Sequence, residues 1–132
     1  MSAVQAGEPI AIYGDYDVDG VSATAVLFHT LHEVARQLQR TLDIRTYVPH
    51  RLDEGYGLNV QAVEELAAAG ARVIVSVDCG VTAFLPALAA KRAGTDLIIT
   101  DHHNLPETGL GLPEAYCVVH PRLEGSAYPL SL

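Results

Sequence analysis

The chain has 132 residues, of which 49% are apolar, and a formal net charge of −8 from 16 acidic and 8 basic residues. This length and apolar content suit a single domain with a buried core. No apolar stretch approaches the ~20 residues that span a bilayer, and the N-terminus lacks the basic and apolar segments of a signal peptide. A soluble, cytoplasmic protein with no membrane partner is therefore expected.

The acidic balance alone argues against a nonspecific nucleic-acid binder, which normally presents a basic face. Many of the acids are concentrated in a few loops, however, where bound cations would offset their charge. The charge therefore leaves nucleic acid open as a partner. Cys79 and Cys117 form neither a CxxC pair nor a disulfide-dense pattern, which favours a reducing compartment.

Strand and helix signals alternate along the chain. Short apolar or β-branched runs predict strands at Ile10–Tyr13, Ile44–Val48, Val73–Val77, Leu97–Thr100 and Tyr116–Val119. Helices are predicted over Val21–Leu38, from an Asn59 N-cap through Ala69, and over Thr82–Ala93. Repeated βα units predict an α/β fold, a parallel Rossmann-like sheet flanked by helices. Ligands of such sheets bind beyond the carboxyl ends of the strands.

Acidic and imidazole side chains follow three of the predicted strands. The motifs are YGDYDVDG at 13–20, VDCG at 77–80 and TDHH at 100–103. Because the carboxyl ends of parallel strands meet at one edge of the sheet, all three motifs are expected at that edge. This arrangement predicts a metal cluster there.

In the first motif, Asp15, Asp17 and Asp19 are spaced i, i+2, i+4. On an extended segment the carboxylates would share one side, whereas on a tight turn they would converge on one point. Carboxylates so close repel unless they are protonated or bound to a hard cation such as Mg²⁺ or Mn²⁺. The spacing also resembles the start of an EF-hand loop, but no glutamate stands at its twelfth position. A solvated acidic turn is the alternative for this motif taken alone.

The second and third motifs add one carboxylate and an imidazole pair. Asp78 is placed to bridge two cations, although it would serve equally well as the N-cap of the helix near Thr82. Of the adjacent His102 and His103, one can bind metal while the other faces substrate, and histidine shifts the preference toward Mn²⁺. The three motifs together predict a two-metal hydrolytic site suited to in-line displacement at phosphorus.

Other features are less specific. The chain has neither a P-loop nor a GxGxxG sequence, which argues against nucleotide-cofactor chemistry. His29 and His32 are expected to be structural, and Cys79 is not expected to bind metal where oxygen ligands dominate. His50 and Arg51 lie in a polar loop that either binds phosphate through Arg51 or simply connects two elements.

In this order and separation, the three motifs resemble those of the DHH phosphoesterase superfamily. The stretches IYGDYDVDG and VPHRLDEGYGL are more specific and resemble the RecJ family of single-strand-specific 5′→3′ DNA exonucleases. The resemblance covers roughly Ile10 to Tyr128. It implies a DHH domain that binds two Mn²⁺ or Mg²⁺ ions and acts on single-stranded DNA.

The resemblance also implies a role for each motif residue. The implied metal ligands are Asp15, Asp17, Asp19, Asp78 and His102. Among them, Asp78 would bridge the two ions. His103 would face the scissile phosphate. Asp101 would orient the histidines without binding a metal ion itself.

The chain departs from the family pattern at its end. His120-Pro121 stands where relatives read Asn-Pro, and the fourth-motif aspartate does not follow. Residues 1–132 are therefore expected to form a partial DHH domain without the later DHHA1 and OB-type domains, inactive or weak by itself.

Two other functions stay open. One is a DHH phosphodiesterase for short oligonucleotides or cyclic dinucleotides, which the RecJ-like stretch PHRLDEGYGL disfavours. The other is a noncatalytic interaction module, which the intact set of expected ligands disfavours.

Overall fold

The computed structural model describes residues 2–50 and 56–129. Its elements are α1 (Ser2–Ala6), β1 (Ile10–Gly14), α2 (Val18–Gln37), β2 (Ile44–Tyr47), α3 (Val60–Ala68), β3 (Val73–Val77), α4 (Phe84–Ala93), β4 (Asp96–Thr100) and β5 (Cys117–Val119). The strands form one parallel sheet in the order β2-β1-β3-β4-β5. The prediction of a parallel α/β sheet flanked by helices is confirmed.

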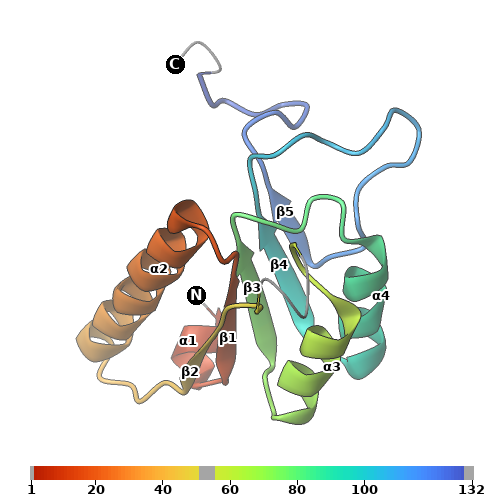
Figure 1. Cartoon of the computed structure of the whole chain (residues 1–132). Coiled ribbons are helices and arrows are strands. Elements are labelled where there is room, and N and C mark those ends of the chain that lie inside the picture. Colours follow the sequence, from red (N-terminus) through yellow and green to blue (C-terminus); the bar gives the residue numbers. More distant parts are fainter. Residues whose placement is uncertain (1, 51–55, 130–132) are drawn as a thin grey trace.

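Helices cover both faces of the sheet (Figure 1). On one face, α3 and α4 pack over a core that includes Val63, Ile74 and Leu97. On the other face, α1 and α2 enclose a smaller core that includes Val4 and Ala35. No helix within the described ranges is both long enough and apolar enough to cross a membrane.

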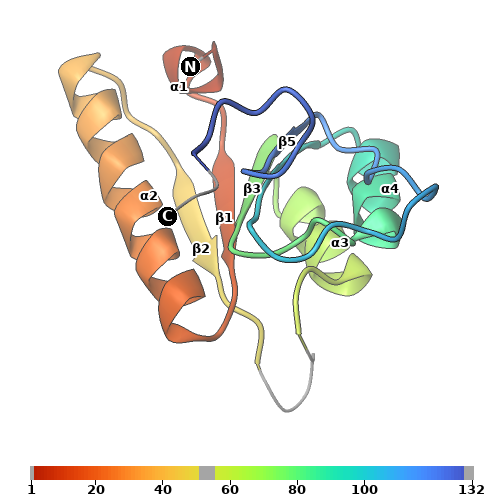
Figure 2. The same ribbon diagram turned by 90° about the horizontal axis from the view of Figure 1, so that it is seen from above.

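The strand order reverses at β1. The chain moves outward from β1 to β2 and then returns past β1 to β3, β4 and β5. Figure 2 looks onto one edge of the sheet and shows α2 on one side of β1 with α3 and α4 on the other. Where consecutive crossovers leave to opposite faces, a crevice opens beyond the carboxyl ends of the strands, and open α/β sheets bind ligands there.

The start of α2 differs from its prediction. The Asp17 carboxylate accepts a hydrogen bond from the Gly20 backbone N–H at 2.9 Å and caps the helix, which therefore begins at Val18 rather than Val21. Glycine is common in turns, but Gly20 lies inside the first helical turn. Two of the aspartates of the first motif thus belong to a helix terminus.

Two glycines bring α2 close to the end of β1. A Cβ atom at Gly14 would lie 2.0 Å from Oγ1 of Thr24, and one at Gly20 would lie 2.6 Å from the backbone of Asp15. The Thr24 hydroxyl donates to the Gly20 carbonyl at 2.8 Å. The absence of side chains at both glycines therefore lets the helix start rest on the segment that carries the first acidic motif.

We predict that Gly14→Ala lowers the free energy of unfolding by about 1–3 kcal/mol, because the added methyl group overlaps the Thr24 hydroxyl. In a Thr24→Ala background the same substitution should cost less, since the overlapping oxygen is gone. Urea unfolding of the four chains measures this coupling. Equal costs in the two backgrounds would contradict the close packing of α2 on β1.

Candidate metal centre

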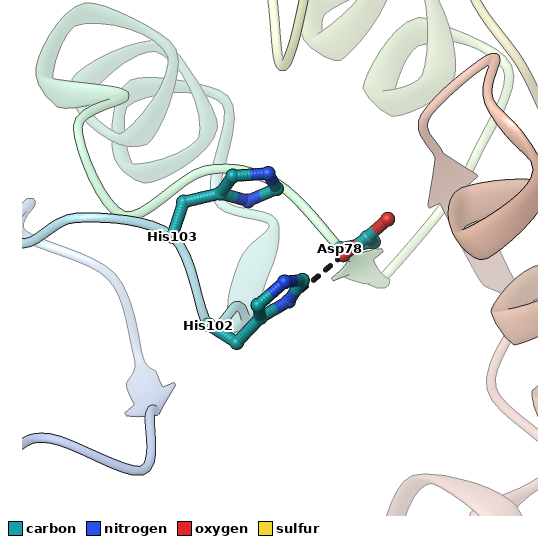
Figure 3. Close-up of side chains that lie close together, drawn as sticks. All are labelled: Asp78, His102 and His103. Carbon is teal, nitrogen blue, oxygen red and sulfur yellow. Dashed lines mark ion pairs between the residues drawn. The ribbon is translucent and has the colours of Figure 1, made fainter.

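The carboxyl ends of β3 and β4 bring one carboxylate and two imidazoles together. One ligand atom from each of Asp78, His102 and His103 lies within 4.8 Å of the others (Figure 3). Nδ1 of His102 lies 3.0 Å from Oδ1 of Asp78. The Asp78 side chain is 7% exposed and that of His102 is 60% exposed. A largely buried carboxylate therefore faces an imidazole that is open to solvent.

The loop after β3 holds Asp78 in an uncommon backbone conformation. Its φ of 64° lies in the left-handed region, which aspartate tolerates better than most residues. The Asp78 backbone N–H donates to the Thr100 carbonyl at 2.9 Å, and the Ser76 hydroxyl donates to the Cys79 carbonyl at 2.8 Å. These bonds fix the turn that presents the carboxylate. The helix that follows has Ala83 as its N-cap, so Asp78 does not cap it.

Like charges surround the Asp78 carboxylate. Burial raises the pKa of Asp78, and the negative charges of Asp17 and Asp19 raise it further, whereas His102 lowers it. Carboxylates after β1 therefore act on the carboxylate after β3. A divalent cation between them would relieve this repulsion.

The structure separates the three aspartates that follow β1. Asp15 is fully buried, and its Oδ2 atom has no hydrogen-bond partner among the described residues. Asp17 caps α2, while Asp19 lies in the first turn of that helix. Asp19 lines the same cavity as Asp78 and His102. The sequence allowed all three carboxylates to converge on one point, but the helix start spreads them instead.

The available donor atoms fit a hard divalent cation. A buried carboxylate oxygen without a partner, as in Asp15, is a rare feature that a bound ion would explain. Carboxylates together with one or two imidazoles suit Mn²⁺ or Mg²⁺. Burial and the neighbouring carboxylates raise the pKa of the Cys79 thiol, so this residue offers no thiolate.

Asp101 organises the loop that carries both histidines. Its Oδ1 accepts hydrogen bonds from the backbone N–H groups of His102 at 2.7 Å and His103 at 3.0 Å, and from Nδ1 of His103 at 2.8 Å. Its Oδ2 accepts from the Val81 backbone N–H at 2.8 Å. Burial alone would raise the pKa of Asp101, but these hydrogen bonds outweigh burial and lower it. Asp101 therefore stays ionised and links the loops after β3 and β4.

His103 lies between Asp101 and Tyr56. The hydrogen bond to Asp101 raises the pKa of His103, which favours the imidazolium form. The Tyr56 hydroxyl lies 3.1 Å from Nε2 of His103. Burial and the nearby charges of Asp15 and Asp101 raise the pKa of Tyr56 to about 12, so its hydroxyl stays protonated near neutral pH. Tyr56 belongs to the GYG stretch of the sequence, but nothing in its spacing indicated a contact with the histidine.

His120, which the sequence showed only as a departure from Asn, supports the same loop. It is 5% exposed, and its Nε2 donates to the His103 carbonyl at 2.7 Å. Its Nδ1 accepts from the Arg122 backbone N–H at 3.1 Å. Both ring nitrogens are therefore bonded, which fixes the tautomer. Only its position after the last strand could have signalled this role.

The remaining candidates lie away from the described ligand group. His29 and His32 lie on α2 and contact the Phe28 ring, with centroids 5.5 and 4.4 Å away. His50 is exposed, and Arg51 lies outside the described residues. Phosphate binding by His50 and Arg51 therefore stays a prediction.

Comparison with protein families decides the assignment. A model described as the DHH family, N-terminal domain, matches residues 9–128. The chain belongs to the DHH family. The family name matches the sequence of the third motif, Asp101-His102-His103.

The resemblance to RecJ is also confirmed. The single-stranded-DNA-specific exonuclease RecJ of Bacillus subtilis (strain 168) is 43% identical over 127 residues, which cover 96% of this chain and 15% of the relative. A crystal structure of exonuclease RecJ bound to manganese matches with a TM-score of 0.78 and 35% identity, over 94% of this chain and 29% of the other. The structure of RecJ from Thermus thermophilus in complex with Mn²⁺ matches with a TM-score of 0.69 and 29% identity. This match covers 91% of this chain and 15% of the other. The chain thus spans only a minor part of these proteins.

We predict that Asp101→Asn lowers the pKa of His103 in the metal-free chain, because a neutral amide stabilises the imidazolium less than a carboxylate does. NMR titration of the imidazole carbons measures the change. His32, on the far part of α2, is an internal control whose imidazole signals at any one pH should coincide in the two chains. An unchanged pKa of His103 would contradict the pairing with Asp101.

Proposed function

We propose that this chain is the metal-binding DHH portion of a RecJ-like exonuclease that hydrolyses single-stranded DNA in the 5′→3′ direction. The observation that carries the proposal is the convergence of Asp78, His102 and His103 at one sheet edge. Asp19 lines the cavity beside them. Similarity to RecJ proteins over nearly the whole chain supports the choice of substrate.

The proposed ions are Mn²⁺ or Mg²⁺. The residues that would hold them are Asp15, Asp17, Asp19, Asp78 and His102. The chemistry supplied by two such ions is activation of a water molecule and neutralisation of charge on the phosphate. Asp78 has a central place in this set, because its carboxylate contacts His102 and responds electrostatically to Asp17 and Asp19.

His103 would act on the substrate itself. Asp101 accepts a hydrogen bond from its Nδ1. Nε2, which lies 3.1 Å from the Tyr56 hydroxyl, is then the ring nitrogen that can exchange this neighbour for a phosphate oxygen. The bond to Asp101 favours the imidazolium, and an imidazolium can donate a hydrogen bond to the phosphate or a proton to the leaving oxygen.

A cavity of about 750 Å³ adjoins the cluster between α2 and β5. Asp19, Asp78 and His102 line it together with Tyr128, and no lysine or arginine among the described residues does so. Its volume suits a ligand of a few rings. Phosphates of a longer strand would find no cationic side chain there, which supports the expectation that the chain alone is inactive or weak.

We predict that Asp78→Asn weakens Mn²⁺ binding by at least ~10–100-fold, the loss usual for groups that merely support metal ligands. Calorimetric titration of the purified chain measures the affinity. Asp96→Asn is the matched control, because Asp96 is exposed at the opposite end of β4 and should leave the affinity unchanged. Equal Mn²⁺ affinity in wild type and Asp78→Asn would contradict the assigned centre.

A substrate comparison tests the reaction. With Mn²⁺, we expect the chain to release mononucleotides slowly from a labelled single strand, faster than from a duplex, and Asp78→Asn to abolish the release. Gel analysis of the products measures the rates. Faster cleavage of dinucleotides or cyclic dinucleotides would favour the short-substrate phosphodiesterase. Metal binding without hydrolysis of any substrate, in a longer chain that also carries the fourth-motif aspartate, would favour the noncatalytic module.

A further inference from the structure

A second cavity, of about 340 Å³, lies beside the histidine pair. We name it the Tyr56 cavity; it is lined by Tyr56, Gly57, Leu58, residues 80–86, Asp101, His103 and Asn104. His103 lines this cavity, whereas His102 lines the larger one. The centroids of the two imidazole rings are 4.6 Å apart. The histidine pair therefore stands between two cavities, and a ligand at the pair can extend into both.

The Tyr56 cavity has an aromatic wall that is held in place. The Tyr56 ring makes edge contacts with His103, at a centroid distance of 5.8 Å, and with Tyr16, at 6.4 Å. The adjacent Gly57 carbonyl accepts a hydrogen bond from the buried Tyr13 hydroxyl at 2.9 Å. Tyr56 is nevertheless 58% exposed. An exposed aromatic ring in a fixed orientation is a suitable surface for stacking.

The other lining groups are mostly apolar. Leu85, in the first turn of α4, is 70% exposed and is followed by the buried Pro86. Asn104 adds one polar group: its Oδ1 accepts from Nη1 of Arg122 at 3.2 Å. This bond orients the amide and leaves its NH₂ group as a hydrogen-bond donor.

The charged groups of the cavity lie on the side of the metal centre. The Asp101 carboxylate already accepts hydrogen bonds from the protein, and His103 is the residue that would face the phosphate. The remainder of the lining offers the rings of Tyr56 and Phe84, aliphatic side chains, the Thr82 hydroxyl and one amide donor. This chemistry suits a heteroaromatic base, whose ring can stack and whose edge carries acceptors, better than it suits a phosphate.

We propose that the Tyr56 cavity binds the nucleobase of the nucleotide whose phosphate lies at the metal centre. This inference rests on the proposed nuclease function and adds a base subsite to it. Because every base has a stacking face and the described lining has a single side-chain amide, the subsite would accept all bases. Such tolerance is what an enzyme that degrades a strand residue by residue requires.

The test is an NMR titration of the ¹⁵N-labelled chain with dAMP, deoxyadenosine and inorganic phosphate, each in the presence of Mg²⁺. We expect dAMP and deoxyadenosine to shift the amide signals of residues 80–83 and Asn104 through the ring current of the base. Inorganic phosphate should leave the signals of residues 80–83 unchanged. Shifts by dAMP at Ser22 and Val119, which line the larger cavity, in place of residues 80–83 would overturn the proposal.

Variants at the wall sharpen the test. Leu85→Ala and Tyr56→Ala should each weaken dAMP binding by about fivefold or more, the usual range for losing a base contact of this kind. Leu85→Ala should also leave phosphate binding unchanged. Tyr56→Phe should keep the affinity, because the ring remains. Leu110→Ala and Tyr116→Ala are matched controls: these side chains are 63% and 74% exposed and lie outside the cavity. Unchanged dAMP affinity in Leu85→Ala and Tyr56→Ala would overturn the proposal.

Failure of this inference differs from failure of the proposed function. Mn²⁺ and phosphate binding without any preference for dAMP over phosphate would overturn the base subsite and leave the metal centre intact. Absence of Mn²⁺ binding would contradict the function. Deoxyadenosine needs no metal, so its shifts at residues 80–83 test the cavity in either case.

Discussion

One buried carboxylate, Asp101, connects the parts of the site. It accepts hydrogen bonds from Val81 in the loop after β3 and from His102 and His103 in the loop after β4. A buried charge is costly unless it is hydrogen-bonded, so each donor is held where it can reach this carboxylate. The hydrogen bonds to this negative charge therefore set the geometry of the two loops, and the hydrophobic core supports the strands that carry them.

The register of the parallel strands explains why the three motifs lie together at one edge of the sheet. Gly14 pairs with Val77, and Val77 pairs with Thr100, so these three strands end together. The next residue in each case is an aspartate: Asp15, Asp78 or Asp101. Parallel pairing thus places three carboxylates at one edge although 86 positions separate the first from the last in the numbering (101 − 15). The carboxylates of Asp17 and Asp19, just beyond β1, raise the pKa of Asp78 at this edge, and a divalent cation would offset their repulsion.

Sequence reasoning was most accurate where one physical signal dominates. β-branched runs between glycines located the buried strands, and Val73–Val77 matches its prediction at both ends. The start of α2 was placed too late because Gly20 resembles a turn residue, whereas here it allows close packing on Asp15. The contacts of Tyr56 and His120 with the histidine loop depend on the folding together of distant segments, so no local pattern could reveal them.

The acidic character of the chain and the proposed DNA substrate are compatible because of where the acids lie. Asp19 and Asp78 line the larger cavity, and no described lysine or arginine there offsets them. Without cations this surface would repel a phosphate, whereas two divalent ions would cancel the four negative charges of the proposed aspartate ligands and remove this repulsion. Both the binding of the strand at this edge and the hydrolysis of its phosphodiester bond would then depend on the metal. The acidic net charge of the chain is therefore compatible with the proposed metal-dependent site, because the charge at this edge would be set by the bound ions together with the carboxylates.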